Sequence, residues 1–144
     1  MELNPNKYIR AALVSALAAA TGKPVFDEAV PPDVSPQPEE YVLVHCATKE
    51  RFGVSKNHSE WACTSQIEVI SIQEKGYFSS AAVDDIEEDI LNRMNTVQVD
   101  GFTVKFTRLL DSRPQNVIGA TETIVRRILI FEQWLGKSKT ILVT

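Results

Sequence analysis

The segment from Pro5 to Thr21 carries the start, the stop and the apolar stripe of one amphipathic helix. Asn4 is a suitable N-cap, and proline suits the first helical position because its missing N–H is not needed there. Gly22 ends the helix and Pro24 prevents its continuation. The stripe recurs at three- and four-residue intervals through Ile9, Leu13, Ala16, Leu17 and Ala20. Since an apolar helix face must be covered, the rest of the chain has to supply a second layer.

Segments rich in apolar, β-branched and aromatic residues supply the strands of that layer. The expected strands are a short piece at Val25 and Phe26, then Tyr41–Ala47, Trp61–Glu74, Val99–Leu109 and Thr121–Gln133. In Trp61–Glu74 the apolar side chains fall on both faces, which predicts a bulge or a strand covered on both sides. In Val99–Leu109, simple alternation predicts one shared face for Phe102, Val104 and Phe106.

A second helix is expected between the two groups of strands. Ser79 or Ser80 is its candidate N-cap, and the acids of Asp84–Asp89 occupy its early turns, where the helix dipole favours them. Its predicted buried stripe is Val83, Ile86, Ile90 and Met94. The order of elements predicts an α+β fold, in which two helices pack on a largely antiparallel sheet. Residues 1–144 are expected to form a single domain, with 136–144 as a candidate flexible tail.

Three polar segments separate these elements. Pro31–Glu40 holds four prolines in ten residues and predicts an irregular loop. Lys49–Glu60 is expected to be a long exposed loop or a hairpin arm. Leu110–Ala120 contains proline, asparagine and glycine and is expected to be a loop before the last strand.

Composition narrows the classes of function. The 144 residues carry a formal net charge of −4, which argues against a duplex-binding module. The first ten residues do not read as a secretion signal, and no stretch approaches the roughly 18 apolar residues of a membrane span. Two cysteines are too few for a disulfide framework, so we expect a reduced intracellular protein.

The residue types of catalytic and metal sites are present without a matching pattern. His45 and Cys46 are adjacent on an expected strand and should project to opposite faces, so they do not suit one tetrahedral ion together with His58 and Cys63. The same residues lack the third group that would orient a Cys/His nucleophile pair. The Asp84–Asp89 run lacks the spacing of a calcium loop, and the glycines are isolated. We therefore expect no catalytic constellation, no cofactor and no metal.

Several features suit contacts between subunits. Arg126 and Arg127 are adjacent within an apolar strand, so one of them needs a partner within or between subunits. The basic 49–60 segment could pair with the acidic second helix of a neighbouring copy. The candidate interface residues are Lys49, Arg51, Phe52, Lys56 and His58, then Asp84, Asp85 and Glu88, then Arg126 and Arg127, and finally the apolar Ile141, Leu142 and Val143.

The order of these features resembles the tail terminator, or tail completion, proteins of long-tailed bacteriophages. The resemblance spans most of the chain but contains no diagnostic motif. It is carried by the helix Asn6–Thr21, the piece Val25–Asp27 before a proline-rich loop, the strands Tyr41–Val44 and Gln66–Val69, the helix Ser80–Met94 and two closing strands.

The resemblance implies a non-enzymatic virion protein of the tail or neck, assembled in the host cytoplasm. It implies a homo-oligomeric ring, most often a hexamer, that caps the tail tube, ends its polymerisation and joins the tail to the head connector. Its partners would then be the tail tube protein and a head-completion or connector protein. DNA would pass through the ring lumen without sequence-specific binding, and no membrane is involved. A ring of this kind needs two different complementary patches on each subunit.

Three alternatives stay open. Another ring of the same particle, such as a head-closure or tail tube component, shares most of these expectations, although a tube protein should polymerise indefinitely. A small ligand- or peptide-binding module predicts a monomer or dimer with a concave pocket. An undetected hydrolase or metal enzyme predicts an activity that alanine at His45, His58 or Cys63 abolishes.

Overall fold

The computed structural model describes residues 4–55, 58–76 and 78–138. The elements in chain order are α1 (Pro5–Thr21), β1 (Val25–Asp27), β2 (Glu40–Ser55), β3 (His58–Glu74), α2 (Ala81–Met94), β4 (Thr103–Pro114), β5 (Val117–Ile118) and β6 (Glu122–Ser138). Two helices on a mostly antiparallel sheet confirm the predicted α+β class.

Helix α1 follows its sequence signals closely. The Asn4 Oδ1 atom accepts a hydrogen bond from the backbone N–H of Asn6 at 3.2 Å, and Pro5 opens the helix. Gly22 ends it in the left-handed conformation, with φ of 66°, and donates its N–H to the Ala18 carbonyl at 3.1 Å. The predicted bounds of this helix are confirmed.

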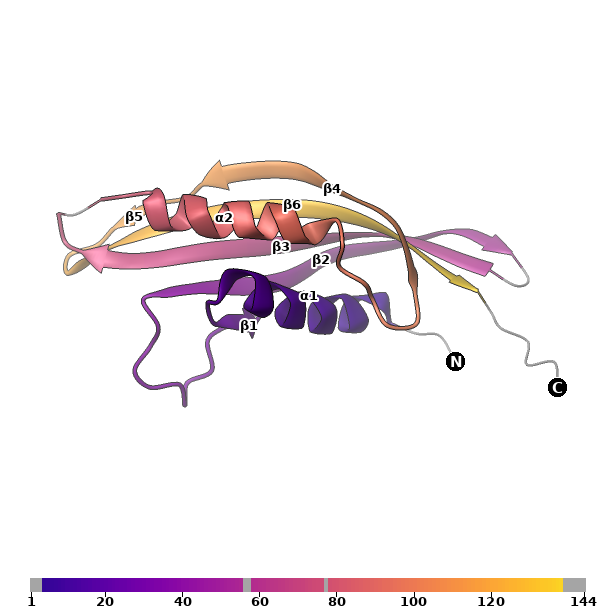
Figure 1. The fold of residues 1–144 in the computed structure, drawn as a ribbon, viewed down its shortest axis with the longest axis horizontal. Helices are drawn as coiled ribbons and strands as arrows, with labels where there is room; N and C mark the ends of the chain where they lie inside the picture. Colours follow the sequence, from indigo (N-terminus) through magenta and orange to yellow (C-terminus); the bar gives the residue numbers. More distant parts are fainter. Residues whose placement is uncertain (1–3, 56–57, 77, 139–144) are drawn as a thin grey trace.

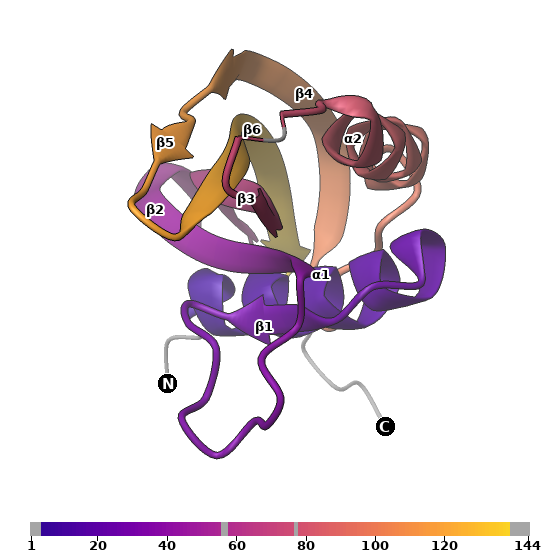
Figure 2. The ribbon, with the colours of Figure 1, turned by 90° about the vertical axis from the view of Figure 1, so that its left-hand side faces the viewer.

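The sheet has the strand order β1-β2-β3-β6-β4, with β5 also paired to β6. Only the β1–β2 pair is parallel. Both helices cover one face: α1 lies along β1 and β2, α2 lies against β3 and β6, and the helices contact each other (Figures 1 and 2). The sheet is strongly curved when viewed end-on (Figure 2).

The core lies between the helices and this sheet face. The predicted α2 stripe is buried, as are the α1 residues Ile9, Leu13 and Leu17. Alternate residues of β3 and β6 meet them, and the same cluster includes Val42, Val44, Cys63, Ile67, Val69, Val125, Leu129, Phe131 and Leu135. The alternation along β3 and β6 therefore fixes which sheet face the helices cover.

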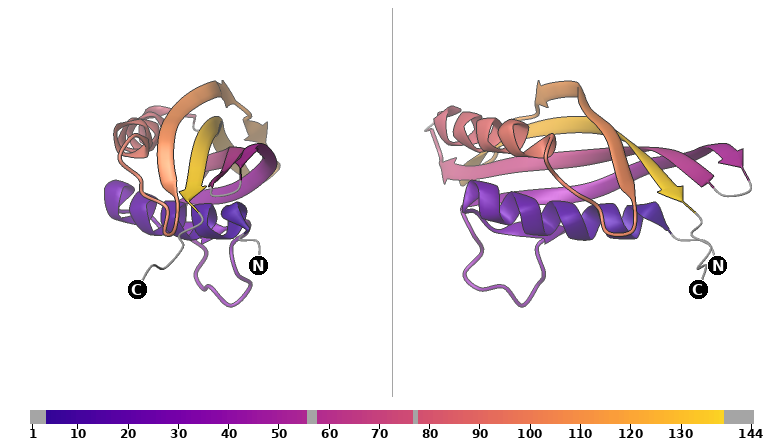
Figure 3. Two further views of the ribbon diagram at one scale, coloured as in Figure 1. Left: turned by 90° about the vertical axis from the view of Figure 1, so that its right-hand side faces the viewer. Right: turned by 45° about the vertical axis from the view of Figure 1, so that its right-hand side comes forward.

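Strands β2 and β3 are longer than expected and form a hairpin arm. They pair from Glu40 with Ser71 out to Ser55 with His58. The arm projects past the end of α1 (Figure 3, right). Of the two expectations for Lys49–Glu60, the hairpin arm is therefore correct.

The predictions of a loop at Leu110–Ala120 and of a tail at 136–144 are both wrong in part. The segment Leu110–Ala120 is not one loop, because β4 continues to Pro114 and Val117–Ile118 form β5. The last strand runs on to Ser138, so 136–138 belong to β6 rather than to a tail. Backbone pairing across the sheet extends both strands beyond the segments that local residue preferences indicate. Residues 139–144 lie outside the described part of the chain.

The shared face predicted for β4 is wrong at Phe106. A register shift between Val104 and Phe106 pairs Val104 with the buried Leu135 but Phe106 with Trp134, on the opposite face. Phe102 instead packs against the Trp61 ring on the helix side, at 5.4 Å between centroids. One inserted residue reverses every side chain that follows it, which alternation counting does not detect.

Strand β3, which carries apolar side chains on both faces, has no bulge against β6. Its pairs with β6 run without a shift from His58 with Ser138 to Glu74 with Glu122. Ile70, on the face away from the helices, is nevertheless 2% exposed. Of the two expectations, a bulge against β6 is therefore wrong, and burial on both faces is found at Ile70.

Candidate functional site

The edge formed by β4 and β5, termed the β4–β5 edge, carries most of the exposed large apolar side chains among the described residues. Strand β4 ends the sheet order and pairs there with β6 alone. Of the seven large apolar side chains that stand most exposed among the described residues, five lie on this edge, with Ile118 at 81%. They are Phe106, Leu109, Leu110, Val117 and Ile118. A long apolar edge strand is a template for contact with another chain.

The cations of β4 are neutralised by neighbouring acids. Arg108 pairs with Glu132 at 2.8 Å, and Arg113 lies 3.8 Å from Asp111. Lys105 contacts Glu60 of β3. Exposed apolar side chains, rather than an excess of charge, therefore distinguish this edge.

The predicted basic residues of the arm have partners within the subunit. Lys49 Nζ donates to Asn4 Oδ1 at 2.8 Å, and Arg51 donates to Ser59 Oγ at 3.0 Å. His58 Nε2 lies 3.0 Å from Glu60 Oε1. The Arg51 guanidinium also lies 5.8 Å from the centroid of the Trp61 ring. These contacts fix the side chains along the arm, and they leave the proposed contact with a neighbour as a prediction.

The remaining candidates of the arm and the C-terminus cannot be placed. The side chains of Phe52 and Lys56 lie outside the described residues, as do Ile141, Leu142 and Val143.

Some of the acidic residues of α2 form ion pairs and hydrogen bonds within the subunit. Arg127 Nη2 donates to Asp84 Oδ1 at 3.0 Å, and Nη1 donates to Glu87 Oε2. Ser112 of β4 also donates to Glu87, at 2.7 Å. Burial by itself would lower the pKa of Arg127, but the hydrogen bonds that it donates to the Asp84 and Glu87 carboxylates outweigh burial and raise it. Asp85 and Glu88 remain exposed on the outer side of α2.

The two adjacent arginines point to opposite faces. Arg127 lies on the helix side, so its partners come from within the subunit. Arg126 lies on the other face, opposite Ile70, and its buried Nε has no hydrogen-bond partner among the described residues. Tyr41 lies near it, and burial raises the pKa of the Tyr41 hydroxyl although Arg126 acts to lower it.

The histidines and cysteines do not form a reactive pair. His45 Nε2 lies 2.8 Å from Glu68 Oε2, while the Cys46 thiol donates to the Asn6 carbonyl at 3.6 Å on the helix side. Burial raises the pKa of Cys63 to about 11, which keeps this thiol protonated and unreactive near neutral pH. Within the described ranges, no three His, Cys, Asp or Glu residues are placed to hold a metal ion.

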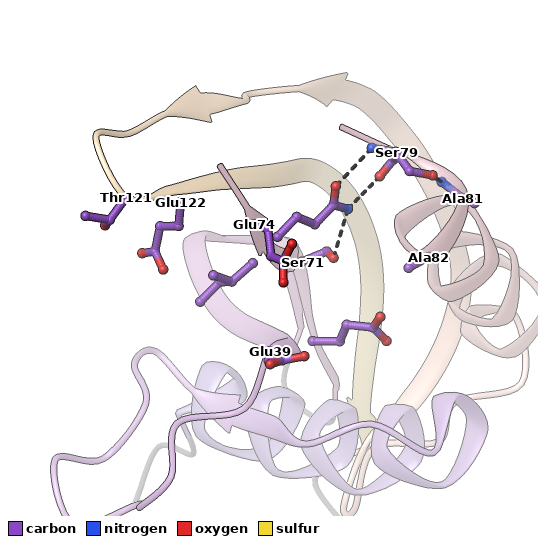
Figure 4. A pocket seen from close by; sticks show the side chains of 11 residues that line it. Glu39, Ser71, Glu74, Ser79, Ala81, Ala82, Thr121 and Glu122 are labelled. Carbon is purple, nitrogen blue, oxygen red and sulfur yellow. Dashed lines mark hydrogen bonds between the residues drawn. The ribbon is translucent and has the colours of Figure 1, made fainter. Parts of the chain in front are cut away.

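A cavity of about 730 Å³ opens beside the end of β3, the start of α2 and the start of β6 (Figure 4). Its lining includes the carboxylates of Glu39, Glu40, Glu74 and Glu122 and contains no histidine, cysteine or lysine. The sequence analysis did not find this site, because its acids come from three separate segments with no local motif.

The wall of this cavity ties β3 to the start of α2. Gln73 Nε2 donates to the Ser79 carbonyl at 2.7 Å and to Ser71 Oγ at 3.2 Å. Gln73 Oε1 accepts the Ser79 N–H at 2.9 Å. Ser79 Oγ in turn accepts the Ala81 N–H at 3.3 Å, whereas Ser80 makes no side-chain cap. Of the two candidate caps, Ser79 therefore supplies the capping oxygen.

None of the helices in the described ranges is long and apolar enough to cross a membrane.

Comparison with known proteins identifies the fold rather than a family. No family model matches the sequence, and no curated protein matches it either. Among solved structures, the chain is similar to a chain of the virion of a native gene transfer agent (GTA) particle. The two share 17% sequence identity with a TM-score of 0.66, over 94% of this chain and 99% of that chain. The protein therefore has the fold of that virion chain along almost its whole length.

Proposed function

We propose that this chain is a structural, non-enzymatic subunit of a phage-like virion. The observation that carries the proposal is the structural match to a chain of a GTA virion, which spans nearly all of both chains. A match of whole chain to whole chain is what a shared subunit architecture produces. Because fold alone does not determine function, the proposal also rests on the exposed surfaces of the chain.

Within such a particle, the chain is proposed to be the tail terminator. It acts as one domain, forms a homo-oligomeric ring on the tail tube, stops tube growth and meets the head connector. The exposed β4–β5 edge supports assembly, because an isolated monomer gains nothing from five exposed apolar side chains on one edge. The β4–β5 edge, the arm and the acidic cavity are different surfaces of the subunit. A ring needs two different complementary patches on each subunit, and these surfaces are candidates for them.

The charge of the chain fits a ring through which DNA passes without binding to the protein. The ion pairs on β4 and its neighbours leave no basic stripe along that strand, and the whole chain carries a formal net charge of −4. A weakly acidic lining discourages adhesion of phosphates by like-charge repulsion.

The deciding experiment is the solution mass of the purified protein, measured by light scattering over a range of protein and salt concentrations. The expected result is a closed species near six times the subunit mass of 16.1 kDa, formed either in solution or on added tail tubes. Electron micrographs should then show one ring at a tube end. A chain that stays monomeric and never caps tubes contradicts the proposal.

A tail tube protein is the second candidate, because the same apolar edge could support continued growth. The mass distribution separates the two candidates. Assemblies of a tube protein grow longer as the protein concentration rises, whereas a terminator forms a closed ring of one fixed mass.

A further inference from the structure

Strand β4 has matching chemistry on the two sides of a point between Leu109 and Leu110. Arg108 and Asp111, which carry opposite charges, flank the two leucines, and both lie on the open face because they pair with alternate residues of β6. The next residues outward also share a face in pairs, Thr107 with Ser112 on the helix side and Phe106 with Arg113 on the open face. Two copies of β4 that run antiparallel about this point therefore bring side chains of the same face opposite each other.

Arg108 and Asp111 form the charged pair of this arrangement. Arg108 of each copy lies opposite Asp111 of the other, so the two-fold axis makes the same ion pair twice. The two side chains are 61% and 46% exposed in the single chain, and their contacts with Glu132 and Arg113 lie within the subunit. Phe106, which is 39% exposed, lies opposite Arg113, whose guanidinium can pack over the ring. The edge of β4 is thus complementary to itself in charge.

The inserted residue of β4 fits the same arrangement. Leu110 is the residue added by the register shift between Leu109 and Asp111, and an extra residue puts a regular neighbouring strand out of register. In two antiparallel copies the extra residues lie at the same level, so the pairs before and after the shift both stay in register. Leu109 of each copy then lies opposite Leu110 of the other. These side chains, 41% and 46% exposed in the single chain, cover each other.

Strand β2, which carries the other edge of the sheet, is a poorer partner for β4. It has a register shift of its own between Cys46 and Thr48, but β1 already occupies its edge at Val42–Val44. In the antiparallel register that aligns the two shifts, Thr48 lies opposite Arg108 and provides no counter-charge. Charge complementarity therefore favours β4 of a second copy over β2.

We propose that the β4 strands of two copies pair antiparallel about a two-fold axis between Leu109 and Leu110, which joins the two sheets into one. The pairing covers an apolar edge that is otherwise a template for aggregation. This inference goes beyond the proposed function and does not depend on it. An isologous contact stops at two copies, so the pair is the form of the free subunit and not the ring on the tail.

Charge reversal at the ion pair tests the register. In a dimer of like copies, Arg108→Asp places two acids opposite each other, and Asp111→Arg places two arginines opposite each other. Each variant alone is expected to dimerise about tenfold more weakly than the native chain, because the two-fold axis repeats the repulsion. An equal mixture of the two variants should dimerise like the native chain, since every acid at the contact then faces an arginine.

Sedimentation velocity over a range of protein concentrations measures the dimer against the subunit mass of 16.1 kDa. Asp89→Arg, a charge reversal at an exposed position of α2, is the matched control and should leave dimerisation unchanged. Restoration in the mixture also shows that both variants are folded. The proposal is overturned if the native chain shows no dimer, if each variant alone dimerises as tightly as the native chain, or if the mixture restores nothing.

Discussion

Arg127 of β6 joins its guanidinium to the Glu87 carboxylate of α2, across the interface between the sheet and the second helix. Forty residues separate the two in sequence. The side chains are 18% and 13% exposed, so the pair is largely removed from solvent. Removing one partner leaves the other charge partly buried without its counter-charge.

Substitution Arg127→Ala is therefore expected to lower the free energy of unfolding by about 2 kcal/mol, since Asp84 loses its donor and Glu87 loses its counter-charge and keeps only the bond from Ser112. Urea unfolding followed by circular dichroism measures the change. Arg113→Ala is the matched control, because Arg113 is 61% exposed and its contact with Asp111 is long. The control should change stability by less than about 0.5 kcal/mol. Equal losses in the two variants would contradict a special role for Arg127.

Two neighbouring residues of α2 should differ strongly on truncation. Ile90 is fully buried in the core, whereas Leu91 is 36% exposed. Ile90→Ala should cost about 2–5 kcal/mol from lost transfer energy and the cavity it leaves, and Leu91→Ala less than about 1 kcal/mol. Thermal or urea unfolding of both variants checks this. Comparable costs would mean that α2 packs on the sheet by a different face.

Gly22 should resist substitution because of its backbone conformation rather than its surroundings. A Cβ atom built at Gly22 meets nothing within 4 Å, but its φ of 66° is unfavourable for residues with a side chain. Gly22→Ala should therefore cost about 1 kcal/mol, and Gly22→Asn less, because asparagine tolerates the left-handed region better. Melting temperatures of the two variants give the ranking. A harmless alanine would contradict the observed helix end.

Stability should fall at alkaline pH through Cys63. Burial raises the pKa of this thiol from its ordinary value of 9.0 to about 11 in the folded protein. Between these values the unfolded state has lost the proton that the folded state still holds. The contribution is thus fully present below about pH 9 and is lost as pH rises toward 11.

The size of that loss is about 2–3 kcal/mol over the window. Urea midpoints at pH 8 and pH 10.5 should therefore differ more in the native chain than in Cys63→Ala. Both chains share the raised pKa values of Tyr41 and Cys46, so only the difference between them reports on Cys63. If stability depended on pH identically in the two chains, burial would not raise the pKa of Cys63.

Local signals in the sequence were sufficient for the helices. The caps at Asn4 and Gly22 and the stripe of α2 depend on residues within a turn or two of each other, so short-range pattern determines them. Strand ends were predicted less well. The polar arm and the extension of β6 to Ser138 are strands because they pair with each other across the sheet, not because of their own composition.

Pairing also limits what the sequence could say about the candidate surfaces. The register shifts in β4 decide which side chains reach the open face, and they leave no mark in the spacing of apolar residues. The need of Arg126–Arg127 for a partner was readable from the sequence, but Glu87 as that partner was not, because the contact depends on how α2 lies on the sheet.

The unshifted ladder between β3 and β6 has a mechanical consequence. It runs from the arm, at His58 with Ser138, to the rim of the acidic cavity, at Glu74 with Glu122, over about 55 Å. A pull on the arm along the strands loads all of these pairs in shear at once, rather than opening them one by one. A contact made at the arm is therefore transmitted as tension to the far end of the molecule, and a subunit built this way suits a joint that must carry load.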